Sequence, residues 1–238
     1  MIRPPFFLIL AAICLGLNYL GFIAGVHNTT PAIAEIFIQT GAILLALSGF
    51  IFFREKASIR QVIGMVMVFS GLAVFYRDQI MQLTDNIELY QKGVLFTIGG
   101  GIMWTSYAII QKRLVRSFDP MTLNLVLFSL PAVAYLPFVD FSFFVDLTKG
   151  TWAVLIFLGI NTLLAYGSLG YALKYLEANK VSVIITLNPI ITFSAMAVLM
   201  AMEVTWMVHE NFTFISIAGA AMVVCGAIFT VLTGRKRQ

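Results

Sequence analysis

The stretch FFREKASIRQVIGMVMVFSG, residues 52–71, decides how this chain folds, because it places four charged side chains within seven positions between two apolar runs. Its ending has a counterpart in GAAMVVCG, residues 219–226, where the two glycines have the same spacing. The segment before this second copy, EVTWMVHENF at 203–212, keeps a Glu but holds no Lys or Arg. The pattern predicts two related segments. The loop in the first segment is positively charged, and the corresponding loop in the second has no Lys or Arg.

Composition excludes most soluble folds. Of the 238 residues, 60% are hydrophobic and 11% are charged, and the mean hydropathy is +0.95. So few charges cannot cover the surface of a soluble domain. The basic residues lie at the ends of apolar runs and form no single stripe, so we expect no nucleic-acid partner. The sequence predicts an all-α polytopic membrane bundle with the lipid bilayer around it.

Apolar runs of about 20 residues, long enough to cross ~30 Å of hydrocarbon, predict eight transmembrane helices. The runs are at 6–26, 30–53, 58–76, 93–113, 121–139, 152–173, 180–202 and 212–233. In the fifth run, Pro131 and Pro137 predict a kink and not a break.

Charge predicts the orientation of these helices. Twelve of the 15 Lys and Arg residues lie at the two termini and in the connections after the second, fourth and sixth runs. Basic residues accumulate on the cytoplasmic side, so both termini are expected in the cytoplasm. The charged connection at 54–60 is then a topological anchor, a solvated loop with no further role.

The two related segments extend backward into whole helices. Residues 31–55, PAIAEIFIQTGAILLALSGFIFFRE, align with residues 179–203, NKVSVIITLNPIITFSAMAVLMAME, at an offset of 148. The predicted orientation gives the copies opposite directions, so the repeat is inverted across the membrane, as is common in secondary transporters. The glycines seven residues apart share one helix face, which favours close helix packing at Gly64, Gly71, Gly219 and Gly226.

These residues also carry a family resemblance. The pattern W-x2-Y-x3-QKRL at 104–114, the segment 172–203 and the E…G-x6-G endings resemble EamA-type members of the drug/metabolite transporter superfamily. The resemblance implies ten helices in two five-helix repeats. Residues 1–76 match the last three helices of the first repeat, 77–92 are an external connection, and 93–238 match a complete second repeat.

The resemblance implies a secondary transporter of small organic solutes, of amino-acid or metabolite type, in a bacterial inner membrane. It also implies that the first two of ten helices are absent, and an upstream start, a natural short form and an artificially trimmed sequence all stay open. Those two helices line the cavity in such proteins. A transport-incompetent fragment or assembly partner is therefore an alternative, and an integral-membrane enzyme is a further one.

Glu35 is the only acidic residue well inside a predicted span, and Gln39 follows one helical turn later on the same face. A carboxylate in the membrane is costly and is functional by default, so Glu35 is a candidate for proton coupling. The alternative is an interfacial polar residue without a function.

Aromatic and amide side chains complete the expected substrate pathway. Trp104, Tyr107 and Tyr166 are candidates for an aromatic wall, although stripes of this kind also occur in packing. The amides of Asn18, Asn161 and Asn188 either contact a solute or join helices, and Asn188 precedes Pro189, which removes one helical hydrogen bond.

No enzyme chemistry is expected. The sequence has no HExxH motif and no nucleophile with the neighbours that catalysis needs, and the glycine-rich IGGGI at 98–102 has no following Lys for a phosphate loop. His27 and His209 lie at the predicted outer edge without metal-ligand spacing. We expect no catalytic, cofactor or metal residues, and the expected partner is a small-molecule solute. A homodimer stays open.

Overall fold

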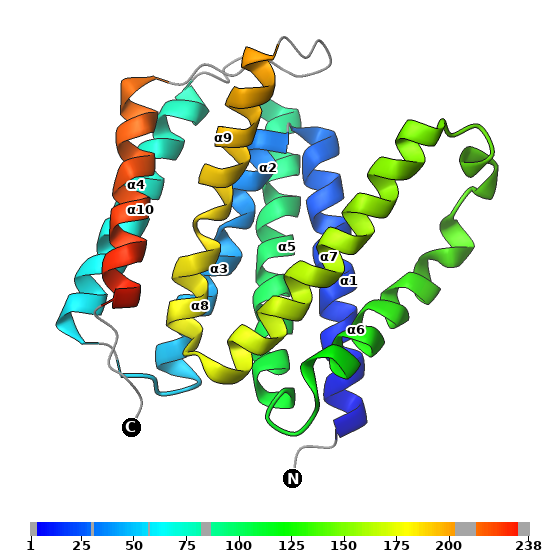
Figure 1. Ribbon diagram of the computed structural model, residues 1–238, viewed down its shortest axis with the longest axis horizontal. Coiled ribbons are helices and arrows are strands. Elements are labelled where there is room, and N and C mark those ends of the chain that lie inside the picture. The colour runs from blue at the N-terminus through cyan, green and yellow to red at the C-terminus, as the bar shows by residue number, and fades with distance from the viewer. Residues whose placement is uncertain (1–3, 30, 57, 82–86, 203–212, 233–238) are drawn as a thin grey trace.

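The computed structural model describes residues 4–29, 31–56, 58–81, 87–202 and 213–232, and within them it forms helices and no strand (Figure 1). The elements in chain order are α1 (Pro4–Asn28), α2 (Pro31–Ile38), α3 (Thr40–Ile51), α4 (Ile59–Met81), α5 (Ile87–Leu114), α6 (Pro120–Tyr135), the 3₁₀ turns η1 (Leu136–Phe138) and η2 (Phe141–Phe144), α7 (Lys149–Tyr175), α8 (Ala178–Ile185), α9 (Asn188–Ala201) and α10 (Phe214–Leu232). Glu203 and His209, and residues 82–86 of the expected external connection, lie outside the described residues.

All eight predicted apolar runs contain helix, which confirms the polytopic all-α prediction. In the described residues, five helical stretches are long and apolar enough to cross a membrane: Phe6–Asn28, Ile33–Ile51, Gln91–Leu114, Pro120–Phe138 and Lys149–Tyr175. The third and eighth runs hold the shorter apolar helices Ile59–Phe75 and Ile217–Thr230, and α8 with α9 occupies the seventh. Helix α6 continues through Pro131 and ends at Tyr135, where the 3₁₀ turn η1, which contains Pro137, follows, so Pro131 does not break the helix.

Two of the runs predicted as single helices are interrupted. The second run breaks at Gln39, between α2 and α3, where ψ is −14° and falls short of the ~−42° of a regular α-helix. The seventh run breaks at Thr186 and Leu187, between α8 and α9, just before Pro189, which has no N–H to donate. The offset of 148 carries Gln39 onto Leu187. Both copies are therefore interrupted at the same aligned position.

Helices α4 and α10 lie side by side and run in opposite directions (Figure 1). A methyl group added to Gly71 would lie 2.8 Å from the Gly219 carbonyl oxygen, and one added to Gly226 would lie 2.7 Å from the Gly64 carbonyl oxygen. The two backbones thus touch at both glycine pairs. Because helices gain little hydrophobic energy from meeting in lipid, such close backbone packing is what holds them together.

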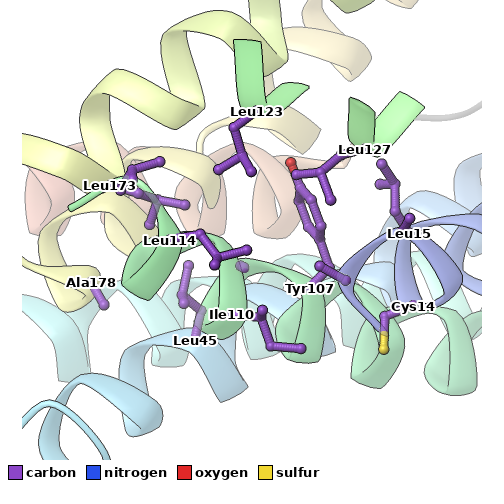
Figure 2. Packing of buried hydrophobic residues seen from close by; sticks show 14 of the residues in the cluster. Cys14, Leu15, Leu45, Tyr107, Ile110, Leu114, Leu123, Leu127, Leu173 and Ala178 are labelled. Atoms are coloured by element: carbon purple, nitrogen blue, oxygen red, sulfur yellow. The ribbon is translucent and has the colours of Figure 1, made fainter. Parts of the chain in front are cut away.

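A second antiparallel pair, α1 with α5, is built on the same principle. A methyl group on Gly21 would lie 2.9 Å from Gly100 Cα, so these backbones are also in close contact. Around this pair, side chains from α1, α3, α5, α6, α7 and α8 form a buried cluster that includes Leu15, Tyr107 and Leu127 (Figure 2). This cluster fixes the helices that form the walls of the cavity described below.

The glycine contacts make a direct stability prediction. Gly219→Ala should lower the free energy of unfolding by about 1–3 kcal/mol, because its methyl group would meet Phe75 N at 2.7 Å and backbone cannot move away as a side chain can. Thermal unfolding of the purified protein in detergent measures this.

Gly99→Ala is the matched control, since a methyl group there meets nothing within 4 Å. This control should unfold at the parent temperature or slightly above it, because Ala favours helix by up to ~1 kcal/mol over Gly. Equal unfolding temperatures for the two variants would contradict the packing role of Gly219.

Candidate functional site

A cavity of about 660 Å³ lies between α1, α2, α3, α5, α7, α8 and the start of α9. Seven of the eight residues expected to form a substrate pathway line it: Asn18, Glu35, Gln39, Trp104, Asn161, Tyr166 and Asn188. Both helix interruptions border the cavity, one through Gln39 and the other through Asn188. The structure thus brings residues from five different helices to one space.

Glu35 and Gln39 form the polar part of the α2 wall. Gln39 Nε2 donates a hydrogen bond to Glu35 Oε1 at 3.3 Å, across one helical turn. Gln39 is buried and Glu35 is half-buried, and both line the cavity together with Trp104 of α5 and Tyr166 of α7. The cavity lining contains one carboxylate and no Lys, Arg or His among the described residues.

The aromatic part of the wall centres on Tyr166. Its ring packs edge-to-face on Phe128 at 4.9 Å between centroids and lies 6.5 Å from Tyr19. Tyr107 lies 6.1 Å behind Tyr166, but it is fully buried in the cluster of Figure 2 and does not line the cavity. Tyr19 does line the cavity. It was not among the residues predicted from the sequence, although it directly follows Asn18.

The amides divide into two groups. Asn18 is buried and its Nδ2 donates to the Gly100 carbonyl oxygen at 3.0 Å, which joins α1 to α5 beside the cavity. Asn161 and Asn188 line the cavity with exposed side chains. An amide that already holds two helices together is less available to a solute than one that is exposed in the cavity.

A further amide pair supports the cavity wall from outside. Gln111 Nε2 donates to Asn124 Oδ1 at 2.7 Å, and Asn124 Nδ2 donates to the Tyr166 carbonyl oxygen at 2.8 Å. Asn124 therefore links α5, α6 and α7. Because Tyr166 belongs to the aromatic wall, this link positions that wall.

The charged connection at 54–60 differs from its prediction at one residue. Arg54, Lys56 and Arg60 are exposed, as a solvated anchor requires. The side chain of Glu55 is only 8% exposed and makes contacts across the bundle. The prediction of a loop with no further role is therefore wrong for Glu55, because its partners are more than 50 residues away and no local pattern marks them.

The described residues contain no group of three or more His, Cys, Asp or Glu side chains that could hold a metal ion. The bundle consists of apolar helices that are long enough to span a membrane. They surround a partly polar cavity, which borders both helix interruptions. These features define an integral membrane protein of the transporter class.

The family comparison agrees with this class. The model of the EamA-like transporter family matches residues 2–77 and 91–232, and the chain belongs to this family. The resemblance noted in the sequence to EamA-type members of the drug/metabolite transporter superfamily is confirmed.

Curated relatives are similarly described. An uncharacterized transporter of Haemophilus influenzae is 31% identical over 225 residues, which cover 94% of this chain and 73% of that protein. The uncharacterized inner membrane transporter YhbE of Escherichia coli K12 is 28% identical over 235 residues, which cover 98% of this chain and 73% of YhbE. A crystal structure with 17% identity covers 97% of this chain and 76% of its own, and its TM-score of 0.73 shows the shared fold.

The link through Asn124 predicts a measurable contribution to stability. Asn124→Leu keeps the side-chain size but removes both hydrogen bonds, so the free energy of unfolding should fall by about 1 kcal/mol, since such bonds in membranes contribute ~0.6 kcal/mol each on average and ~1.7 kcal/mol at most. Unfolding in mixed detergent and dodecyl sulfate measures it.

Ser129→Ala is the control on the same helix, since the Ser129 hydroxyl is exposed and bonds only to the Leu125 carbonyl within α6 among the contacts described. It should leave stability unchanged. If the Asn124 variant unfolds like this control, the amide link does not hold the wall.

Proposed function

We propose that this protein is a secondary transporter of small organic solutes, of amino-acid or metabolite type, which works by alternating access between two inverted halves. The observation that carries the proposal is the cavity that borders both helix interruptions. Its volume of about 660 Å³ lies within the ~300–1,000 Å³ range of sites for small organic ligands. In transporters with inverted repeats, solutes bind near the bilayer midplane at such discontinuous helices.

The lining supports a solute that is neutral or carries an amine. Glu35 is an acceptor for an ammonium group, and the exposed amides of Asn161 and Asn188 offer both donors and acceptors. A simple anion would find no basic side chain among the described lining residues and would lie near the Glu35 carboxylate. Amino acids and amines fit this chemistry better than phosphates or dicarboxylates.

The inner-membrane location proposed for the chain is supported by the name of its relative YhbE and by the distribution of basic residues. We propose further that both termini are cytoplasmic. In a protein whose own Cys14 and Cys225 are replaced by Ala, a cysteine at exposed Lys56 should react with an impermeant maleimide only from the cytoplasmic side, and one at exposed Asp146 only from outside. The reverse pattern would invert the topology.

Transport itself is tested by reconstitution. Liposomes containing the purified protein and preloaded with unlabelled amino acids should take up a ¹⁴C-labelled amino-acid mixture faster than protein-free liposomes, because exchange needs no ion gradient. Lack of uptake of the mixture, and of labelled small amines, in either direction would contradict the proposal. It would favour a transport-incompetent assembly partner, which co-purification with a second membrane protein would identify.

Proton coupling through Glu35 is the finer part of the proposal. The other titratable side chains in the described lining are those of Tyr19 and Tyr166, so Glu35 is its one acidic group. Val183 occupies the aligned position in α8, which makes any coupling unequal between the halves.

Glu35→Gln should abolish the dependence of uptake on a pH gradient while preserving exchange without a gradient, because the amide keeps the shape but carries no exchangeable charge. Asp146→Asn, at an exposed carboxylate far from the lining, should retain the parent pH dependence. Uptake by the Glu35 variant that still follows the pH gradient would remove this residue from coupling and leave transport without protons.

A further inference from the structure

Glu55 caps a helix that belongs to the other half of the protein. Its Oε1 accepts a hydrogen bond from Ala178 N at 2.7 Å, and its Oε2 accepts one from Asn179 N at 3.1 Å. The N-cap residue of α8, Glu177, makes no capping hydrogen bond with its side chain and pairs with Lys180 instead, at 2.9 Å. The N-terminus of α8 is thus capped by a residue of the connection that follows α3, and the negative charge of this residue also complements the helix dipole.

Lys112 of α5 completes this contact. Its Nζ lies 3.1 Å from Glu55 Oε1 and donates to the Leu176 carbonyl oxygen at 2.7 Å, while it also lies 5.2 Å from the centre of the Phe53 ring. The side chains of Lys112 and Glu55 are 6% and 8% exposed. Removing one partner of a buried pair leaves the other charge uncompensated, which costs far more than breaking an exposed pair.

The backbone around Glu55 is shaped for this contact. Arg54 has a φ of 52°, in the left-handed region that non-glycine residues seldom adopt, and Glu55 N then donates to the Gly49 carbonyl oxygen at 2.9 Å. A methyl group on Gly49 would lie 2.5 Å from Glu55 Oε2. The turn brings the carboxylate back over α3, and the missing side chain at Gly49 leaves room for it.

The contact lies at one end of the line along which α3 packs against α8, and both of these helices line the cavity. Along this line, the Ser182 hydroxyl donates to the Ala42 carbonyl oxygen, and Ala42 and Val181 line the cavity. Helices α2 and α9, which the offset of 148 makes the counterparts of α8 and α3, make no comparable contact in the described residues. Among the described residues, α3 and α8 are therefore packed together on the Glu55 side, and α2 and α9 are not packed to the same extent on the other.

We propose that Glu55, Lys112 and the N–H groups of Ala178 and Asn179, here called the Glu55 latch, hold the cavity closed at this end and must separate before it can open there. This inference rests on the proposed transport function, for which opening at both ends is required. Opening moves α8 away from α3, and the latch is the charged contact that such movement has to break.

The aligned sequence offers fewer hydrogen-bond donors for a latch of this kind at the other end. The offset of 148 places Thr30 and Pro31 at the positions of Ala178 and Asn179, and a proline has no N–H to donate. A carboxylate that capped α2 in the same way could accept a hydrogen bond from the N–H of Thr30 but not from Pro31. The latch therefore biases the protein toward closure at the Glu55 end.

The test measures cavity access and needs no solute. In the protein with Cys14 and Cys225 replaced by Ala, a cysteine at Ile185, in the cavity wall, is labelled with an impermeant maleimide in vesicles of each orientation. A separate cysteine at exposed Lys56 shows which vesicles present the Glu55 end. Glu55→Gln and Lys112→Met should raise the labelling rate from that end about tenfold, as expected for losing charged hydrogen bonds, and should lower it from the other end.

Glu177→Gln is the matched control, because it removes the neighbouring Glu177–Lys180 pair, with side chains 22% and 17% exposed, and leaves the Glu55 latch intact. Its labelling rate should equal that of the parent. Gly49→Ala provides a second route, since it displaces the carboxylate without changing any charge and should act in the same direction as Glu55→Gln. A variant that has lost its fold would label faster from both ends.

Parent labelling rates for Glu55→Gln and Gly49→Ala, in protein that elutes as the parent does, would overturn the latch and leave the transport proposal untouched. A labelling response without any solute uptake would keep the latch and overturn the transport proposal. The two failures are thus distinguishable.

Discussion

Backbone-to-backbone contact between antiparallel helices is the constraint on which this bundle depends. In lipid, apolar side chains gain little by leaving their surroundings, so two helices associate where their surfaces fit closely. Gly64 with Gly226 and Gly71 with Gly219 provide this fit for α4 and α10, and Gly21 with Gly100 provides it for α1 and α5. With these two pairs fixed, the interrupted helices α2–α3 and α8–α9 lie between them and border the cavity.

The polar residues of the spans then have two distinct roles. Asn18, Thr105 and Asn124 each donate to a backbone carbonyl on another helix, so they join the frame. Glu35 and Gln39 bond to each other within the α2 wall, and Asn161 and Asn188 are exposed in the cavity. Only the polar residues that line the cavity without joining two helices are placed to contact a solute. Because asparagine occurs in both groups, residue type alone does not distinguish a joining residue from a cavity residue.

The fold could be predicted from the sequence because apolar runs and paired glycines are local signals with a direct physical meaning. Much of the polar part of the cavity lining was also predicted, since a carboxylate or an amide within a span is costly and is therefore expected to face a cavity or a partner. The interruption at Gln39 was not predicted, because Gly41, which aligns with Pro189 at the offset of 148, keeps its N–H and is a much weaker helix breaker than proline. Glu55 was missed for a different reason: a charged residue beside Arg54 and Lys56 indicates a solvated loop, and its capped helix lies 123 residues further along the chain.

The two halves share a pattern but not the same contacts. Glu35 aligns with Val183, and the donors at Ala178 and Asn179 align with Thr30 and Pro31. In an inverted repeat with identical halves, the state open to one side and the state open to the other would have equal free energies. Each sequence difference between the halves therefore favours one of these two states. In this chain, the carboxylate on the cavity wall and the two-donor helix cap both arise from differences between the copies. If the two halves exchange conformations as proposed, backbone symmetry allows two states and the side chains set how unequally these are populated; the proposed Glu55 latch would favour the state that is closed at the Glu55 end.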